Sequence, residues 1–465
     1  MRTTPTIKYR ICMCAIIICF SIGTALAQDY ETNIRPGAHI QRTMKLLEES
    51  TPLKKNTVRI LFYGQSITAQ NWWKEVAEDL MKRYPYANII IKNRAIGGFT
   101  APRLVYTAEY DLYPEYPDLL IFHDYGCTDD GKYEDIIRRT RERTTSEIIL
   151  ITHHDIGLEK NYKESELIRK IAVKYNCGLV DMELQWQEKL RKTGLEYKDL
   201  LSNSPHLNTK GNEWYADFMK GFLRYDQEIE NNEMEKCVTF ISFDDDRFVK
   251  RMDDGSIEVQ FTGNRIDAIP ADNRYTGTMG EVYIDSCKPS DFPGAYSFTR
   301  PSIVPYGWMP ALLKATHNTP LITEDWTLQV IEGSSDGQSF RFRVTGSVTG
   351  IDGEGTNEQP FTSKSGRVVI ENDENWLIGW WLDLIGDKTK EMPTDFKVMW
   401  RVEPHFNEIL AFPNYRFDGT DNAVTLIKGI SNGRHVLRIV PLPGSQIRLK
   451  GFSVYCPPLA NTNIP

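Results

Sequence analysis

The sequence predicts an α/β domain with a parallel sheet, followed by an all-β region of sandwich type. The first observation is that short apolar runs alternate regularly with helical patterns from Val58 onward. The second is a change after Asp226, where a charged linker leads into alternating apolar and polar residues separated by Gly, Asn and Asp. With 465 residues, the chain is also long enough for roughly two to four domains.

The N-terminal segment has the parts of a secretory signal peptide. Basic residues precede an apolar run over 11–22, and Ala25-Leu-Ala27 forms an A-x-A cleavage site before Gln28. The apolar run is too short for a comfortable membrane span, and no later run is apolar enough to be one. We therefore expect residues 1–27 to be cleaved, and the protein to be exported to the periplasm or the extracellular space.

Five apolar runs after a polar lead-in over 28–57 predict the strands of a domain spanning 58–226. Such fully apolar strands are required when helices cover both faces of a parallel sheet. The expected strands are Val58–Tyr63, Ala87–Lys92, Leu119–His123, Glu147–Thr152 and Gly178–Met182. The helices expected around them cover about 40–47, 71–84, 102–110, 133–143, 162–175, 184–192 and 213–224.

The β region has two segments that resemble the halves of a galactose-binding-like jelly roll, one near 261–285 and one near 429–455. More than a hundred residues separate them. We expect a β-sandwich formed by 237–308 and 416–460, with 309–415 as an inserted β domain. One larger sandwich with long loops is an alternative that the sequence leaves open, because all-β domains reach about 200–250 residues.

Charge and cysteine content exclude some classes of partner and site. The net charge of −8 argues against a nucleic-acid partner. Three of the eight cysteines lie in the signal segment, and the spacing of the other five is not that of a zinc site. We expect no metal or other cofactor. Cys127 and Cys177 lie at opposite ends of strands and should not be bonded, whereas Cys237 and Cys456 bracket the β region and could pair.

Serine, glycine, aspartate and histidine residues follow the predicted strands. They should lie together, because the carboxyl ends of parallel strands share one edge of the sheet. On its own, the turn at Ser66 could be an ordinary strand-to-helix turn with a serine cap. The convergence of the other residues at the same edge favours a functional site. They are Ser66 after the first strand, Gly97 and Gly98 after the second, Asp124 to Asp130 after the third, His153, His154 and Asp155 after the fourth, and His206 later.

These residues fall into blocks that resemble the SGNH (GDSL-like) hydrolases over about 58–225. Gly64-Gln-Ser66 stands where the family usually has Gly-Asp-Ser, Asn93–Thr100 matches the glycine block, and Asn203-Ser-Pro-His206 matches the last block. The resemblance implies a flavodoxin-like, three-layer fold with strand order 2-1-3-4-5 and a serine esterase. It makes Ser66 the nucleophile, His206 the base and Gly98 an oxyanion donor.

Two positions depart from the family pattern. Thr128 occupies the place of the third oxyanion donor, usually an asparagine, and Asn203 occupies the place of the triad aspartate. A neutral amide orients His206 but does not compensate the charge of an imidazolium. Asp155 and Asp199 are candidate replacement carboxylates. The alternative is an intact fold whose site has decayed.

Four further residues are candidates for lining the cleft. Trp72 and Trp73 begin the helix after Ser66. Either could stack on a sugar ring, but we expect at least one of them to pack the helix on the sheet. His153 and His154 could suggest a metal, but neighbouring residues on a strand point to opposite faces. We therefore expect them to line the cleft without a metal.

The leading interpretation is an exported serine esterase that removes acyl groups, with acetyl preferred, from a polysaccharide or oligosaccharide. We expect no nucleic-acid partner and no membrane-spanning segment. One alternative is a glycoside-active hydrolase that uses an aspartate pair chosen from Asp124, Asp129, Asp130 and Asp155. A second is a non-catalytic glycan-binding protein.

Overall fold

The structure is a computed structural model. It describes residues 30–126, 130–229, 232–271, 277–304, 307–335, 338–372, 375–377, 382, 394 and 396–459. The expected signal peptide and the positions Cys127, Thr128 and Asp129 lie outside the described residues. None of the helices described is both long and apolar enough to cross a bilayer.

The first domain is built on a five-stranded parallel sheet in the order β2-β1-β3-β4-β5. The predicted fold class is therefore confirmed, and each strand lies within two residues of the position expected from its apolar run. The strands are β1 (Thr57–Gly64), β2 (Asn88–Asn93), β3 (Leu119–His123), β4 (Glu147–Ile151) and β5 (Gly178–Val180).

Helices cover both faces of this sheet because its side chains alternate between them. In β1, Val58, Ile60 and Phe62 point to one face, whereas Leu61 and Tyr63 point to the other. The first face packs against α2 (Gln41–Glu48), α4 (Trp72–Arg83), α8 (Met182–Thr193) and α9 (Thr209–Phe222). The second packs against α5 (Ala101–Asp111), α6 (Lys132–Arg143) and α7 (Glu159–Lys174).

A short helix, α10 (Asn232–Lys236), leads to two antiparallel sheets. The seven-stranded sheet contains β8 (Val238–Ser242), β9 (Val249–Arg251), β10 (Ile257–Pro270), β11 (Gly280–Ile284), β20 (Ile409–Leu410), β21 (Val424–Pro441) and β22 (Leu449–Tyr455). The six-stranded sheet contains β12 (Tyr296–Phe298), β13 (Ser302–Ile303), β14 (Asp325–Gly333), β15 (Phe340–Gly346), β16 (Gly350–Thr356) and β19 (Lys397–Pro404). A separate pair joins β17 (Phe361–Thr362) to β18 (Val369–Ile370).

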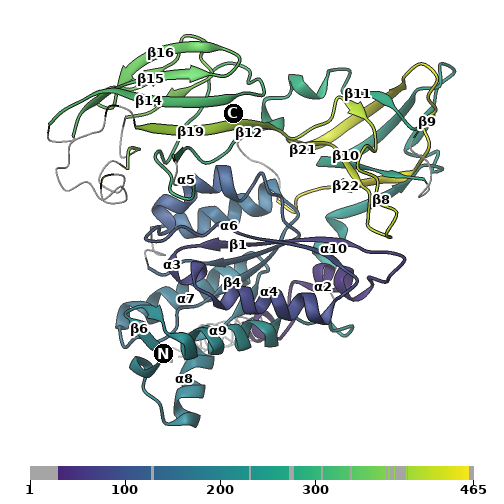
Figure 1. Cartoon of the computed structure of the whole chain (residues 1–465). Helices are drawn as coiled ribbons and strands as arrows, with labels where there is room; N and C mark the ends of the chain where they lie inside the picture. The colour runs from purple at the N-terminus through teal and green to yellow at the C-terminus, as the bar shows by residue number, and fades with distance from the viewer. Residues whose placement is uncertain are drawn as a thin grey trace, which may run out of the picture.

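Strand pairing divides the β region into two modules. Strands before residue 285 pair with those after 408, and the strands from 296 to 404 pair with one another. The six-stranded sheet thus begins before 309 and ends before 415, the bounds expected for the insertion. Its core is continuous with the core around α5 and α6, and Figure 1 shows it on the α5 side of the parallel sheet.

All four cysteines described in this structure are free thiols: Cys177, Cys237, Cys287 and Cys456. The pairing considered for Cys237 and Cys456 is therefore not formed. The two residues nevertheless face each other, because the N–H of Cys456 donates to the carbonyl of Cys237 at 2.8 Å.

Candidate active site

A tight turn at the end of β1 places Ser66 at the carboxyl edge of the sheet. Gly64 has φ +150°, and a Cβ there would lie 1.9 Å from the carbonyl oxygen of His123, so only glycine fits. The short helix α3 (Ser66–Ala69) begins at the serine itself. Gln65 caps this helix, since its Oε1 accepts from the N–H of Ile67 at 3.4 Å.

A hairpin of β6 (Leu201–Asn203) and β7 (His206–Leu207) brings His206 to the serine. The Nε2 atom of His206 lies 2.9 Å from Ser66 Oγ, and its Nδ1 lies 2.6 Å from Asn203 Oδ1. One tautomer satisfies both contacts: Nδ1–H donates to the amide oxygen, and Nε2 accepts from the serine hydroxyl. This is the tautomer that a general base requires.

The side chains of Gln70 and His154 hold this hairpin in place. The side chain of Gln70, just after α3, donates to the carbonyl of Leu207 at 2.8 Å and accepts from its N–H at 3.0 Å. His154 Nε2 donates to the carbonyl of Pro205 at 2.9 Å. Both neighbours of His206 in the chain are therefore tied to the α/β domain. The role of Gln70 was not predicted from the sequence, because a single glutamine has no pattern that predicts a two-point contact.

The Ser66 hydroxyl has a second hydrogen-bond acceptor, which was not predicted from the sequence. The Oε1 atom of Gln65 lies 2.5 Å from Ser66 Oγ. A hydroxyl carries one proton, so Ser66 donates either to Gln65 or to His206 at a given moment. From the sequence, only the position of Gln65 next to Ser66 could have indicated that its side chain accepts from the Ser66 hydroxyl.

The glycine block lies against the serine and is fastened to the same short helix. Asn93 Nδ2 donates to the carbonyl of Thr68 at 2.8 Å, and Asn93 Oδ1 accepts from the N–H of Ala95 at 2.9 Å. A Cβ placed on Gly97 would lie 4.0 Å from the Cβ of Ser66. Gly98 has φ +75°, a left-handed conformation that glycine takes without strain. Thr128, the expected third donor, is not among the described residues.

Neither candidate replacement carboxylate hydrogen-bonds to His206 among the contacts described. Asp155 accepts from the N–H of Gly157 at 2.7 Å and from the hydroxyl of Tyr162 at 3.2 Å. Asp199 accepts from the N–H of Glu196 at 2.9 Å. The structure therefore gives Asn203 as the partner of the His206 Nδ1–H.

The described aspartates of the glycoside alternative differ in their environments. Asp124 is fully buried and accepts from the N–H of Ala101 at 2.6 Å, and this burial raises the pKa of its carboxyl well above the usual range. Asp130 is exposed and accepts from the N–H of Lys132. Asp129 is outside the described residues.

Three of the four expected lining residues are instead part of the core beneath the site. Trp72, His153 and His154 have no exposed surface. Trp72 Nε1 donates to the carbonyl of Ile67 at 2.7 Å, so this tryptophan supports α3 rather than a substrate. Trp73 is half-buried, with its ring 5.9 Å from that of Phe62.

Burial sets the protonation state of the two histidines. Burial lowers the pKa of His153, although its Nε2 lies 3.0 Å from Glu164 Oε2, and it lowers the pKa of His154 to about 3. Both are therefore neutral near pH 7. Within the residues that the structure describes, no group of three or more His, Cys, Asp or Glu side chains could hold a metal ion.

Comparisons with known proteins give partial structural likenesses only. No protein-family model matches the chain, and no curated protein matches it. An acetylxylan esterase from Geobacillus stearothermophilus is 18% identical, with 38% of this chain and 98% of that chain covered and a TM-score of 0.34. An alpha/beta hydrolase enzyme from the metagenome of Lake Arreo, Spain, is 16% identical, with 37% and 98% covered and a TM-score of 0.33.

Proposed function

We propose that this chain is an exported serine esterase that removes acyl groups, acetyl groups in particular, from a polysaccharide or oligosaccharide. The observation that carries the proposal is the alignment of Ser66 Oγ, the two nitrogens of His206 and Asn203 Oδ1 in one hydrogen-bonded series. Ser66 and His206 are both half-buried at the sheet edge, so a substrate reaches them from solvent.

The reaction follows from this geometry. Ser66 Oγ attacks the ester carbonyl while His206 Nε2 takes the hydroxyl proton, and His206 then returns that proton to the leaving sugar hydroxyl. The N–H groups of Ser66 and Gly98 are the donors for the oxyanion. Water, activated by the same histidine, then hydrolyses the acyl-serine. Asn203 keeps the imidazole in its tautomer but adds no negative charge.

Hydrolysis of p-nitrophenyl acetate and of acetylated oligosaccharides tests the proposal. Ser66→Ala and His206→Ala should abolish turnover while circular dichroism stays unchanged, and Ser347→Ala, an exposed serine of the six-stranded module, should be fully active. Mass analysis should show loss of an acyl group and no loss of a sugar. Full activity of a folded Ser66→Ala variant on the substrate would reject the serine mechanism.

Export is part of the proposal and rests on the signal-peptide features of residues 1–27. Protein recovered from the periplasm or the medium should begin at Gln28 when its N-terminus is sequenced. Recovery of exported protein that retains Met1 would contradict cleavage at this bond.

A further inference from the structure

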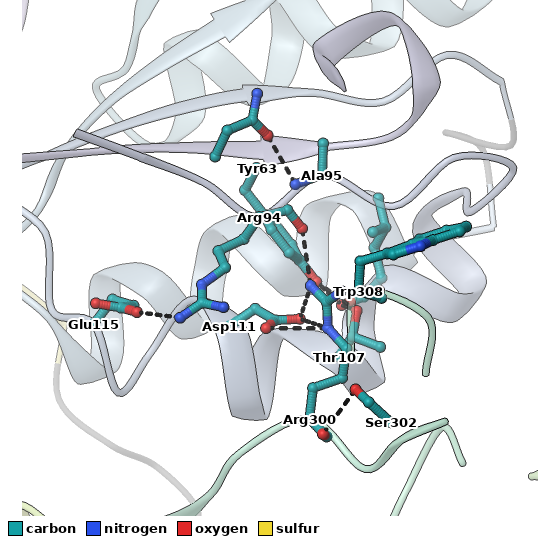
Figure 2. Close-up of polar contacts among 11 residues, drawn as sticks. Tyr63, Arg94, Ala95, Thr107, Asp111, Glu115, Arg300, Ser302 and Trp308 are labelled. Carbon is teal, nitrogen blue, oxygen red and sulfur yellow. Dashed lines mark hydrogen bonds and ion pairs between the residues drawn. The ribbon is translucent and has the colours of Figure 1, made fainter. Parts of the chain in front are cut away.

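One buried guanidinium joins the six-stranded module to the α/β domain near the candidate active site (Figure 2). Arg300, which follows β12, lies 2.8 Å from the carboxylate of Asp111 in α5, and their side chains are only 9% and 2% exposed. The Nε of Arg300 donates to the same carboxylate at 3.0 Å. A buried, two-point charge pair of this kind holds a single geometry, because separating it leaves each charge without compensation.

The remaining donors of Arg300 hold one backbone carbonyl on each side of the junction. Its Nη2 donates to the carbonyl of Arg94 at 3.1 Å, and its Nη1 donates to the carbonyl of Trp308. Arg94 follows β2 and donates its N–H to Phe62 in β1 at 2.9 Å. The backbone of Trp308 is therefore fixed relative to the loop that carries Gly97 and Gly98.

That loop continues directly to the nucleophile. The N–H of Ile96 donates to the carbonyl of Gly64 at 3.0 Å. Gly97, whose Cβ position lies 4.0 Å from Ser66 Cβ, is three residues from Arg94 and so at most ~11 Å away along an extended chain. With the guanidinium added, Trp308 lies at most ~20 Å from Ser66. A glycan chain of several rings is long enough to contact both residues at once.

The indole of Trp308 is left in solvent. It is 52% exposed, whereas Trp72, Trp186 and Trp326 have no exposed surface. Figure 2 shows the ring extending away from the ion pair instead of packing back onto it. The Arg300 contact holds the backbone of this tryptophan, and its ring presents a flat apolar face and a polar N–H to solvent.

We propose that Trp308 forms a sugar-stacking subsite that binds one ring of a glycan chain while an ester on another ring lies at Ser66. This inference rests on the proposed function and makes it more specific, because it assigns the enzyme to glycan chains instead of acylated monosaccharides. The C–H face of a sugar ring packs on an aromatic face, and its hydroxyl groups stay hydrated at the edge. Arg300 is a positioning residue in this arrangement.

Kinetics on substrates of different length test the subsite. The substrates are p-nitrophenyl acetate and acetylated xylo-, gluco- and chito-oligosaccharides, each supplied as the monosaccharide and as longer chains. Trp308→Ala should raise KM for the long chain about tenfold with kcat unchanged, as loss of one stacking contact of ~1.4 kcal/mol predicts. The same variant should hydrolyse p-nitrophenyl acetate and the monosaccharide ester at the wild-type rate.

Two further variants make the result specific. Trp308→Phe keeps an aromatic face and should restore most of the affinity for the long chain. Phe417→Ala removes a more exposed aromatic from the segment that contacts Lys55 just before β1, at the opposite edge of the sheet. This variant should leave the kinetics on both substrates unchanged. An unchanged KM of Trp308→Ala for the long chain, or an equal loss on p-nitrophenyl acetate, would overturn the subsite.

Binding to an inactive variant separates this inference from the esterase proposal. Ser66→Ala should bind the long oligosaccharides in calorimetry, and the double variant with Trp308→Ala should bind them about tenfold more weakly. If wild type cleaves p-nitrophenyl acetate but Ser66→Ala binds no oligosaccharide, the subsite is wrong and the esterase stands. If oligosaccharide binding depends on Trp308 but no ester is cleaved, the subsite stands and the esterase is wrong.

Discussion

Asn203→Asp should make the enzyme faster. In the structure, Asn203 Oδ1 already lies 2.6 Å from His206 Nδ1, so the substitution adds a negative charge without a change of shape. The imidazolium that forms when His206 takes the Ser66 proton would then be paired with a carboxylate. Two unit charges ~4 Å apart attract by about 1 kcal/mol in water and about 4 kcal/mol at an effective dielectric constant of 20.

The exposure of the site sets the expected size of this effect. Asn203 is exposed and His206 is half-buried, so the lower part of the range applies, about 1–2 kcal/mol. This corresponds to a rise in kcat/KM of roughly 5- to 30-fold. In chymotrypsin, the opposite change from Asp to Asn costs about 10⁴, chiefly through the wrong tautomer. Here Asn203 already accepts from Nδ1–H, so charge is the only gain.

The assay is initial-rate kinetics with p-nitrophenyl acetate, and the matched controls are Asp155→Asn and Asp199→Asn. Neither of these carboxylates hydrogen-bonds to His206 among the described contacts, so both controls should stay within about twofold of wild type, less than ~0.5 kcal/mol. A rate for Asn203→Asp at or below wild type, with Ser66→Ala inactive, would refute the reasoning. A tenfold loss in either control would identify that carboxylate as the missing charge.

Three other measurements address the site and its support. Gln70→Ala should lower kcat about 10- to 100-fold with little change in KM, because it frees the strand that carries His206. The pKa of buried His154 is about 3, below the ~6.5 of an unfolded chain, so its contribution to stability is complete above pH 6.5 and is lost as pH falls. That loss is about 2 kcal/mol at pH 5. The free energy of unfolding, measured with urea, should therefore fall less between pH 7 and pH 5 for His154→Phe than for wild type. Mild oxidation should join Cys237 to Cys456 and stabilise the fold by about 2–4 kcal/mol, since residues opposite in antiparallel strands are ~5 Å apart; Cys237→Ser should abolish the gain.

The parallel sheet could be predicted because its information is local. Each strand contains a short apolar run, and β3, β4 and β5 are buried along their whole length, as burial on both faces requires. Turn residues mark where the runs end. The pairing of the two antiparallel sheets is different. β12 and β13 pair with β19, about a hundred residues later, and no alternation within a strand encodes which distant strand it joins. The alternation within each strand therefore does not predict that this sheet begins at Tyr296 and ends at Pro404.

Within the site, the sequence predicted which residues would meet but not which side they would face. Trp72 and His154 stand beside Trp73 and Asp155 in the chain, and one residue of shift decides between the core and the surface. Trp72 begins α4 on the face packed against β1, and His154 is buried and donates to the Pro205 carbonyl. The contacts of Gln65 and Gln70 depend on single side chains with no periodic signature.

The arrangement separates the two tasks that a triad aspartate performs in one residue. Orientation of His206 is provided by the Asn203 amide, by Gln70 and by the backbone contact from His154. Charge compensation has no source among the contacts described for His206. Gln70 and His154 hold the orientation of His206 whether or not a carboxylate is present. The missing negative charge, in contrast, can be restored by one substitution at the exposed position 203. This difference is why Asn203→Asp should raise the rate, while changes at Gln70 should lower it and should not be rescued by the added charge.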